Sequence, residues 1–148
     1  MHLQKISSSL LDKIKINRVT NTVQQIQGLS KTSLERYSLI IVDSVTDLFS
    51  FEYSKKEQSL EKHVSFMKYM HNLSSIAITG KIPIIVTNIV RTINNHEKEN
   101  LEESISMYTH TKIKLSKVDN GYFCQAISPF DNKKFQYTIT SKGITDQS

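Results

Sequence analysis

Two polar positions that directly follow apolar strands are the strongest candidates for chemistry in this sequence. Asp43 ends the apolar run 39–42, and Thr87 with Asn88 ends the run 84–86. In an open α/β sheet, ligands bind beyond the carboxyl ends of parallel strands, so these side chains are expected at one edge. A carboxylate at that edge can hold a hydrated Mg²⁺ beside a phosphate group. Many α/β proteins use such an aspartate simply to cap the next turn, and this alternative stays open.

A βαβ unit is needed to bring the two strand ends together. Residues 38–42 and 82–87 are continuous apolar runs, which are typical of interior parallel strands buried on both faces. Between them, apolar side chains recur every three or four residues from about 56 to 79, which predicts a long amphipathic helix. Such units take a right-handed crossover, so the central strands are expected to be parallel.

The flanking segments have weaker patterns. Alternation predicts a strand over 14–19, and a helix should follow from the capping residues at 20–22 to about residue 30. Residues 91–100 have no apolar period and are expected to be a loop, and Asn100 with Glu103 resembles a capping box for a short helix.

Beyond residue 112, alternation divided by turn signals at 119–121 and 129–133 predicts antiparallel strands. The predicted fold class is therefore α/β, with parallel central strands and a C-terminal antiparallel three-stranded extension. Residues 1–148 are expected to form a single domain, because neither an internal repeat nor a linker interrupts the sequence.

The composition is that of a globular protein of one-domain length. The chain has 148 residues, of which 38% are hydrophobic and 22% charged, with only four glycines and two prolines; this excludes disordered and collagen-like classes. Neither apolar run approaches the roughly 20 residues of a bilayer span. The first nine residues lack the apolar centre of a secretory signal, so we expect a cytoplasmic protein without a membrane partner. The single cysteine, Cys124, fits a reducing compartment and a small core residue.

Several segments, in this order along the chain, resemble the RecA/RadA recombinase family, and within it the archaeal RadA/RadB-like proteins. The resemblance runs from about residue 11 to residue 144 and is carried by residues 17–26, 39–49, 83–88 and 135–144. It implies the later part of a RecA-like P-loop NTPase core, with ATP and Mg²⁺ as cofactors. It also implies that Asp43 is the Walker B residue holding the Mg²⁺-bound water, with Ser44 beside it in the catalytic site. Thr87 and Asn88 would begin the segment that senses the γ-phosphate.

Parts of the family's nucleotide site have no counterpart here. No G-x-x-x-x-G-K-[ST] phosphate loop, the Walker A motif, occurs in the sequence. The activating carboxylate that the family carries on an upstream strand is also missing. Ile89 stands where recombinases usually carry glutamine, and an alkyl group cannot hydrogen-bond a phosphate. We expect no chemistry from this chain alone and interpret it as a piece of a longer polypeptide lacking its Walker A portion.

The charge pattern gives a weaker indication of a DNA partner. Nineteen Lys and Arg against fourteen Asp and Glu give a formal net charge of +5, which attracts polyanions. The residues that could contact nucleic acid are Lys55, Lys56, Lys62 and Arg91, with Tyr53 and Tyr69 as stacking groups. A solvated helix face is the alternative interpretation. Four glutamates between 97 and 103 occupy the loop that faces DNA in the family, so we expect weak binding to single-stranded DNA that is lost at moderate salt.

Three functions are compatible with these features. The first is a RadA/RadB-like DNA recombination or repair protein, of which this chain holds Walker B but not Walker A. The second is a non-catalytic paralogue that serves as a platform for a recombinase or another protein, and Ile89 and the acidic loop favour it. The third is a RecA-superfamily signalling ATPase. Self-association is compatible with the first two.

Overall fold

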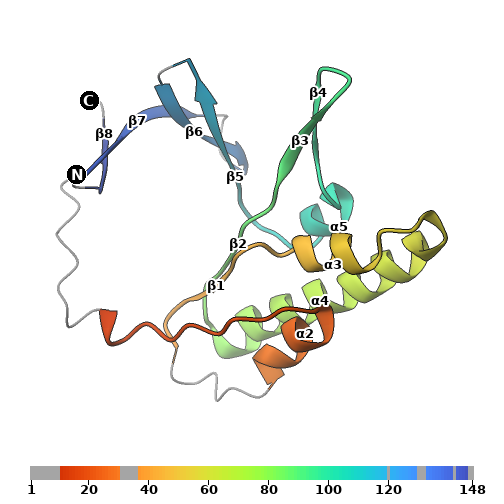
Figure 1. Ribbon diagram of the computed structural model, residues 1–148. Helices are drawn as coiled ribbons and strands as arrows, with labels where there is room; N and C mark the ends of the chain where they lie inside the picture. Colours follow the sequence, from red (N-terminus) through yellow and green to blue (C-terminus); the bar gives the residue numbers. More distant parts are fainter. Residues whose placement is uncertain (1–10, 31–36, 120, 130–132, 142, 147–148) are drawn as a thin grey trace. The chain divides into compact units, whose positions relative to one another are not determined.

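The computed structural model describes residues 11–30, 37–119, 121–129, 133–141 and 143–146 (Figure 1). The chain divides into two compact units. One consists of residues 17–108, and the other combines residues up to 16 with residues 109–148. None of the described helices has the length and apolar character needed to cross a bilayer.

The unit formed by residues 17–108 contains a parallel strand pair. β1 (Ile40–Val42) and β2 (Ile84–Val86) align in parallel, with Ile40 opposite Ile84 and Val42 opposite Val86. The chain between them forms α3 (Asp47–Glu52), the 3-10 helix η2 (Lys56–Gln58) and the 22-residue α4 (Ser59–Gly80). The two predicted strands therefore pair in parallel around the predicted helix, although each strand is only three residues long.

The core of this unit lies between α4 and one face of the strand pair, and Figure 1 shows α4 running along that side. Phe49 and Phe66 are fully buried, with ring centroids 5.1 Å apart in an edge-to-face arrangement. Burial at positions 66, 69, 70 and 73 follows a helical period, so α4 presents one apolar face. The buried cluster consists of Val45, Phe49, Phe66, Tyr69, Met70, Leu73 and Ile105.

The other face of the strand pair is open. Val42, Ile84 and Val86 pack against the core, whereas Ile41 is 61% exposed and Ile85 is 51% exposed. Successive side chains of a strand point to opposite faces, so the helix can cover only one set. The prediction that these strands are buried on both faces is therefore wrong for the described residues.

The helix α2 (Thr22–Ser30) begins where the sequence predicted it. Asn21 Oδ1 accepts a hydrogen bond from Gln24 N at 2.8 Å. The carboxylate of Glu52 accepts from Thr22 N at 2.9 Å and from Thr22 Oγ1 at 2.5 Å. A carboxylate at a helix N-terminus satisfies unpaired N–H groups and complements the helix dipole. This contact attaches the start of α2 to the end of α3.

The strand predicted over 14–19 is wrong. Residues 14–20 have no regular secondary structure, and Ile16 is 86% exposed. Alternation alone does not make a strand, because extended backbone needs a partner for its N–H and C=O groups.

A β-hairpin occupies the segment that was expected to be a loop. β3 (Val90–Ile93) pairs with β4 (His96–Glu99), with Arg91 opposite Lys98. Asn94 and Asn95 join the strands with φ of 50° and 62°, and a two-residue hairpin turn of this kind needs φ > 0 at both positions. Asparagine tolerates this conformation, so the Asn-Asn pair was the signal that periodicity overlooked.

The short helix α5 (Glu102–Ser106) follows the hairpin. The capping box predicted for it is wrong: Leu101 is the N-cap, with φ 51° and no side-chain cap. Asn100 lies one residue before this N-cap, and its Nδ2 donates a hydrogen bond to Ser50 Oγ.

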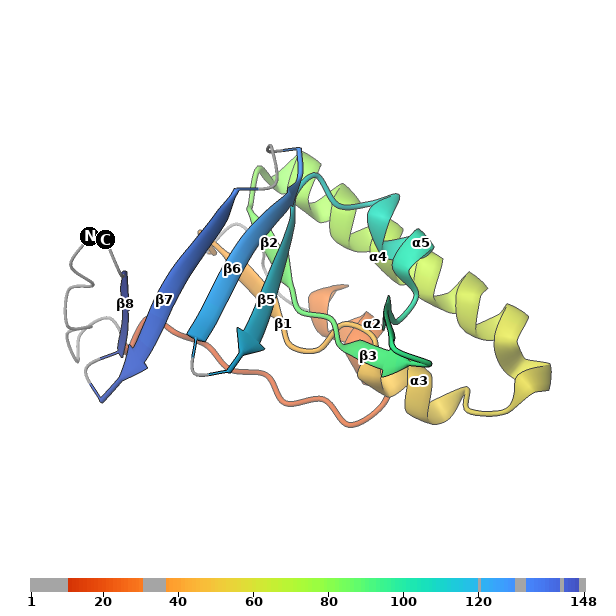
Figure 2. The same ribbon diagram turned by 90° about the horizontal axis from the view of Figure 1, so that it is seen from above.

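The second unit contains an antiparallel sheet in the order β5-β6-β7-β8, whose strands Figure 2 shows side by side. The register aligns Leu115, Cys124 and Phe135 in one row across three strands. The predicted turn segments 119–121 and 129–133 fall between paired strands, and Asn120 and residues 130–132 within them lie outside the described residues. The bounds of the strands are β5 (Lys112–Val118), β6 (Gly121–Ser128), β7 (Lys134–Thr140) and β8 (Gly143–Asp146).

The prediction of a three-stranded extension is wrong because β8 adds a fourth strand. Thr138 lies opposite Thr145, and the two hydroxyl groups are hydrogen-bonded at 2.7 Å. Thr140 Oγ1 donates to Gly143 O at 3.1 Å, and Gly143 has a φ of 114° that favours glycine. Four residues after a turn are too few to display the alternation by which strands are recognised.

The position of the core predicts how two phenylalanines of the same unit respond to substitution. Phe66→Ala is expected to lower the free energy of unfolding by about 3–5 kcal/mol, because it removes a fully buried ring and leaves a cavity. Phe51→Ala is the matched control, since Phe51 is 80% exposed on α3 and should cost less than about 1 kcal/mol. Urea denaturation followed by far-UV circular dichroism measures both, and equal losses would contradict the assigned core.

Candidate functional site

The carboxyl ends of β1 and β2 bring Asp43 and Thr87 into contact. Thr87 Oγ1 donates a hydrogen bond to Asp43 Oδ1, and both residues are exposed. Backbone hydrogen bonds extend the parallel ladder beyond the strands: Thr87 N donates to Val42 O and Val45 N donates to Thr87 O, each at 3.0 Å. Because the ladder fixes both backbones, an acid and a hydroxyl are held side by side at this edge.

The residues at this edge fit a hydrated Mg²⁺. Thr87 engages Oδ1 of Asp43, which leaves Oδ2 as the atom that would accept from a metal-bound water. Ser44 follows through a cis peptide bond, and its buried Oγ has no hydrogen-bond partner in the part of the chain that the structure describes. A buried unpaired hydroxyl costs about 1–3 kcal/mol, so a ligand beside it would gain a binding group. Magnesium usually takes one or two carboxylates and keeps several waters.

The same edge does not supply a phosphate cradle. A triphosphate is held by the backbone N–H groups of a glycine-rich loop. The four glycines lie at 28, 80, 121 and 143, within or at the ends of helices and strands, and none of them lies near Asp43 in the sequence. No three His, Cys, Asp or Glu side chains gather into a metal site among the described residues. Asp43 therefore offers a single carboxylate without the groups that would hold the nucleotide.

Asn88 is engaged on both sides of its carboxamide. Thr46 Oγ1 donates to Asn88 Oδ1 at 2.8 Å, and Asn88 Nδ2 donates to Asn100 O at 2.8 Å. Asn100 in turn donates from Nδ2 to Ser50 Oγ at 2.5 Å and from its backbone N to Ile89 O at 3.3 Å. This network connects α3, the end of β2 and the base of the β3–β4 hairpin. The Asn88 side chain is thus a connector between the strand edge and the hairpin.

Gln25 supports the same edge from α2. Its side chain is 5% exposed, and Nε2 donates to Val45 O at 3.1 Å. Burial raises the pKa of Tyr69, and a hydrogen bond from the Gln25 side chain lowers it by a smaller amount. Tyr69 is only 2% exposed, so the prediction that it stacks on bases is wrong. Tyr53 is half-buried and lies against Phe49, with ring centroids 6.4 Å apart.

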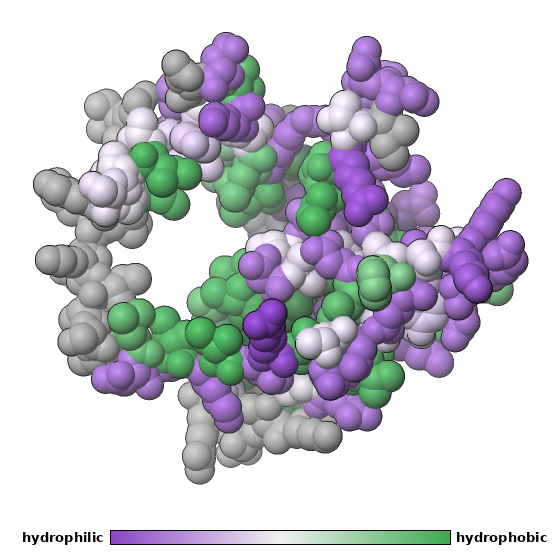
Figure 3. All heavy atoms as spheres, in the orientation of Figure 1, coloured by the Kyte–Doolittle hydropathy of each residue, from purple (hydrophilic) through white to green (hydrophobic). Residues whose placement is uncertain are grey.

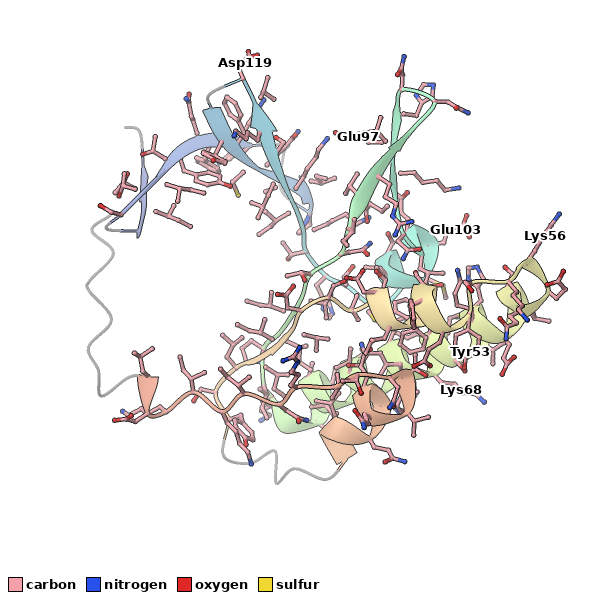
Figure 4. The ribbon with its side chains drawn as sticks, viewed as in Figure 1. Tyr53, Lys56, Lys68, Glu97, Glu103 and Asp119 are labelled. Atoms are coloured by element: carbon pink, nitrogen blue, oxygen red, sulfur yellow. The ribbon has the colours of Figure 1, made fainter. Side chains whose placement is uncertain are left out.

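The predicted nucleic-acid residues lie on separate elements. Lys55 and Lys56 are exposed at the turn before α4, Lys62 is half-buried on α4, and Arg91 is exposed on β3. Figure 3 shows hydrophilic side chains over both the outer end of α4 and the hairpin. In Figure 4, Lys56 points away from the helices, and Glu97 lies on the hairpin itself. The structure does not gather the four cations into one patch.

Sequence reasoning missed the polar residues that position the edge. Their hydrogen bonds join residues that are 12 to 50 positions apart, so a local pattern cannot report them. The one available signal was the presence of polar residues at the ends of strands and helices, where buried backbone and side-chain groups need hydrogen-bond partners. The missed residues are Gln25, Thr46, Ser50 and Asn100.

The mixed α/β arrangement with this strand edge fits a RecA-like fold, and comparison with known proteins specifies the family. Residues 3–147 match the family model described as Rad51. The chain belongs to the Rad51 family.

Individual relatives agree with this assignment. The chain is 33% identical over 103 residues to the DNA repair protein RAD51 homolog 2 of Arabidopsis thaliana, covering 65% of this chain and 26% of that protein. It is 28% identical over 85 residues to the DNA repair protein RAD51 of Mycosarcoma maydis, covering 55% of this chain and 25% of that protein. It is 35% identical over 81 residues to the DNA repair and recombination protein RadB of Thermoplasma volcanium, covering 51% of this chain and 34% of that protein. The matched segments thus amount to a quarter to a third of these relatives' lengths.

The Asn88 network predicts a local effect on the hairpin. Asn88→Ala leaves the buried Thr46 hydroxyl and the Asn100 carbonyl without their partner, so the free energy of unfolding should fall by about 1–3 kcal/mol. Amide hydrogen exchange of residues 90–99 should accelerate, while exchange in the middle of α4 changes little. Hydrogen exchange read by mass spectrometry measures the two segments separately.

Two further variants sharpen this test. Asn88→Asp keeps an acceptor for Thr46 but cannot donate to Asn100 O, so it should release the hairpin as Asn88→Ala does. Asn72→Ala is the control, because it makes the same substitution at an exposed position of α4. Unchanged exchange of the hairpin in both Asn88 variants would show that the network does not hold it.

Proposed function

We propose that this chain is the later part of a RecA-like ATPase core that acts in DNA recombination and repair. Membership of the Rad51 family supports this proposal, as do relatives that are named for DNA repair. The observation that carries it is the contact between Asp43 and Thr87 at the carboxyl ends of two parallel strands. The complete protein would bind ATP, Mg²⁺ and single-stranded DNA, and would assemble with itself or with another recombinase.

Each residue at the edge has a distinct part in this proposal. Mg²⁺, when bound with ATP, would neutralise charge on the phosphate oxygens. Asp43, as the Walker B residue, would accept a hydrogen bond from a metal-bound water. Thr87 orients that carboxylate through its hydroxyl donor, and Ser44 offers a further polar group beside it. Because Asn88 is hydrogen-bonded to Asn100 O, a displacement of the strand edge would also move the hairpin.

The proposed core includes both compact units of the chain as one domain, 1–148. The parallel pair β1–β2 would be the centre of a larger parallel sheet, and the exposed side chains of Ile41 and Ile85 support this extension, because a strand interior to such a sheet is apolar on both faces. The β5–β8 sheet would be the antiparallel extension of the same core.

A second candidate function is a protein-binding paralogue without catalysis. Two observations favour it. Ile89 places an exposed alkyl side chain immediately after the Thr87-Asn88 pair, where a phosphate sensor would need a hydrogen-bonding group. The hairpin that follows displays Glu97 on β4, which repels a phosphate backbone.

The ATP-binding proposal predicts different behaviour for the chain and for a longer polypeptide. The isolated chain should not bind Mg²⁺-ATP in isothermal titration calorimetry, because it lacks the phosphate loop. A polypeptide extended through an in-frame phosphate loop encoded upstream of Met1 should bind it. In that longer protein, Asp43→Asn should lower ATP hydrolysis about 10–100-fold, as expected for a residue that holds a metal through water.

Asp47→Asn is the matched control, because Asp47 is an exposed carboxylate four residues away at the start of α3. It should leave hydrolysis within about twofold of the parent, as expected of a surface substitution away from the site. Millimolar or tighter binding by the isolated chain that Asp43→Ala abolishes would show that the phosphate loop is dispensable. Equal hydrolysis by the Asp43→Asn protein and its parent would overturn the assigned role, and the platform function would then account better for the chain.

A further inference from the structure

The outer edge of β3 carries main-chain groups that do not face β4. Residues directly opposite each other in an antiparallel pair alternate between hydrogen-bonded and non-hydrogen-bonded pairs. Asn100 N donates to Ile89 O at 3.3 Å, one position before the first pair of the β3–β4 register. Counting from this bond, Val90 and Thr92 belong to non-hydrogen-bonded pairs, so their N–H and C=O groups point away from β4.

This edge is accessible to another strand. β3 and β4 form a two-stranded sheet, and Val90 and Thr92 make no further hydrogen bond within the part of the chain that the structure describes. Val90 is 45% exposed, and Arg91 and Thr92 are also exposed. Figure 1 shows the hairpin extending away from α3 and α5 of the same unit. Three of the four residues of β3 are β-branched, which suits them to strand pairing.

The register divides the charges of the hairpin between its two faces. Arg91 lies opposite Lys98, and both are exposed on one face. Glu97 and Glu99 alternate onto the other face. Two cations directly opposite each other destabilise a strand pair, and neither of these two forms an ion pair among the described residues. A carboxylate added to this face would therefore relieve the repulsion.

We propose that the outer edge of β3 binds an extended acidic peptide of a partner protein as a third, antiparallel strand. The main-chain groups of Val90 and Thr92 would pair with the peptide backbone, which is the source of affinity in strand addition. The peptide residue opposite Arg91 would lie on the cationic face and is expected to be Asp or Glu. Its two neighbours would lie on the other face, opposite Val90 and Thr92, where β-branched side chains pack well.

The added strand would also stabilise the hairpin. A two-stranded hairpin is at best marginally stable in water, and a third strand makes such a sheet more stable. The inference goes beyond the ATPase function proposed above, because it requires neither nucleotide nor DNA.

An acidic peptide fits this edge better than a polynucleotide does. The formal charges of Arg91 and Lys98 are cancelled by those of Glu97 and Glu99 on the same hairpin, whereas binding of a phosphate backbone depends on an excess of cations. A polynucleotide also lacks the regularly spaced N–H and C=O groups that pair with a strand edge. A peptide can use these groups and place its carboxylate on the cationic face alone.

Fluorescence anisotropy with a labelled peptide tests the main-chain pairing. The probe is fluorescein-Gly-Ser-Thr-Val-Glu-Val-Thr-Ser-Gly, and the whole chain should bind it in 50 mM NaCl with a Kd below about 1 mM. N-methylation of both valines removes the N–H groups that would face β3 and should weaken binding about tenfold or more. N-methylation of the glutamate is the matched control, because its N–H would point away from β3, and it should change the affinity less than about threefold.

Charge variants test the cationic face. Arg91→Gln should weaken binding of the probe about two- to fivefold, the range of one cross-strand charge pair, and the effect should shrink at higher salt. Arg91→Glu should prefer the peptide in which lysine replaces the glutamate, whereas the parent chain prefers the original probe. Arg18→Gln is the matched control, since it makes the same substitution at an exposed position outside the hairpin, and it should leave the affinity within about twofold.

A further variant blocks the edge itself. Thr92→Pro removes an N–H that does not pair with β4, a position at which an edge strand tolerates proline. It should abolish binding of the probe and retain the parent circular dichroism spectrum. Thr92→Val keeps the N–H and should bind the probe as the parent does. Should Thr92→Pro disturb the fold, the comparison of the N-methylated peptides on the parent chain still decides the question.

Several results would overturn the proposal. They are failure of the parent chain to bind the probe, equal effects of N-methylation at the valines and at the glutamate, and an unchanged affinity in Arg91→Gln. If Thr92→Pro weakens binding of dT30 but not of the probe, the edge takes a polynucleotide instead. If Thr92→Pro converts a dimer into a monomer in analytical ultracentrifugation, the occupant is a second copy of this chain. None of these measurements involves Asp43, so they are separable from failure of the ATPase proposal.

Discussion

The parallel hydrogen-bond ladder between β1 and β2 is the constraint on which the candidate site depends. Three residue pairs define its register, and two further backbone bonds carry it past the ends of the strands to Thr87 and Val45. A slip of one residue would turn every side chain of a strand to the other face, so Asp43 would no longer meet Thr87. The backbone pairing of the two strands thus brings the acid and the hydroxyl to the same edge.

Polar side chains carry this alignment outward to the neighbouring elements. Asn88 uses both the oxygen and the nitrogen of its carboxamide, and Asn100 uses its side chain and both of its backbone groups. Half-buried amides of this kind are costly when unpaired, so each bond favours a single arrangement of α3 and the hairpin. A residue that family resemblance assigns to ligand binding can therefore also have a specific structural role.

The sequence predicted the elements that have a long or repeated pattern. The helix from 59 to 80 and the strands that flank it were recognisable because apolar residues recur at a helical period in the helix and form unbroken runs in the strands. The hairpin at 90–99 was missed because its strands are polar, and only the Asn94-Asn95 turn marks it. The strand expected at 14–19 had the right alternation but no partner, which a single segment cannot reveal.

The candidate site was predictable to a similar degree. The position of Asp43 and Thr87 followed from strand ends, because parallel strands deliver their last residues to one edge. The hydrogen-bond network around Asn88 could not be predicted from the sequence, since its members are far apart in the chain and none belongs to a periodic pattern.

The position of Cys124 has a practical consequence. It is the single cysteine of the 148-residue chain, and it lies in the row of Leu115 and Phe135, on the face away from Lys114 and Lys134. Its side chain is half-buried. A thiol-reactive dye would therefore attach at one known point in the middle of β6 without any engineered cysteine. Its emission would report whether the apolar face of this sheet is covered.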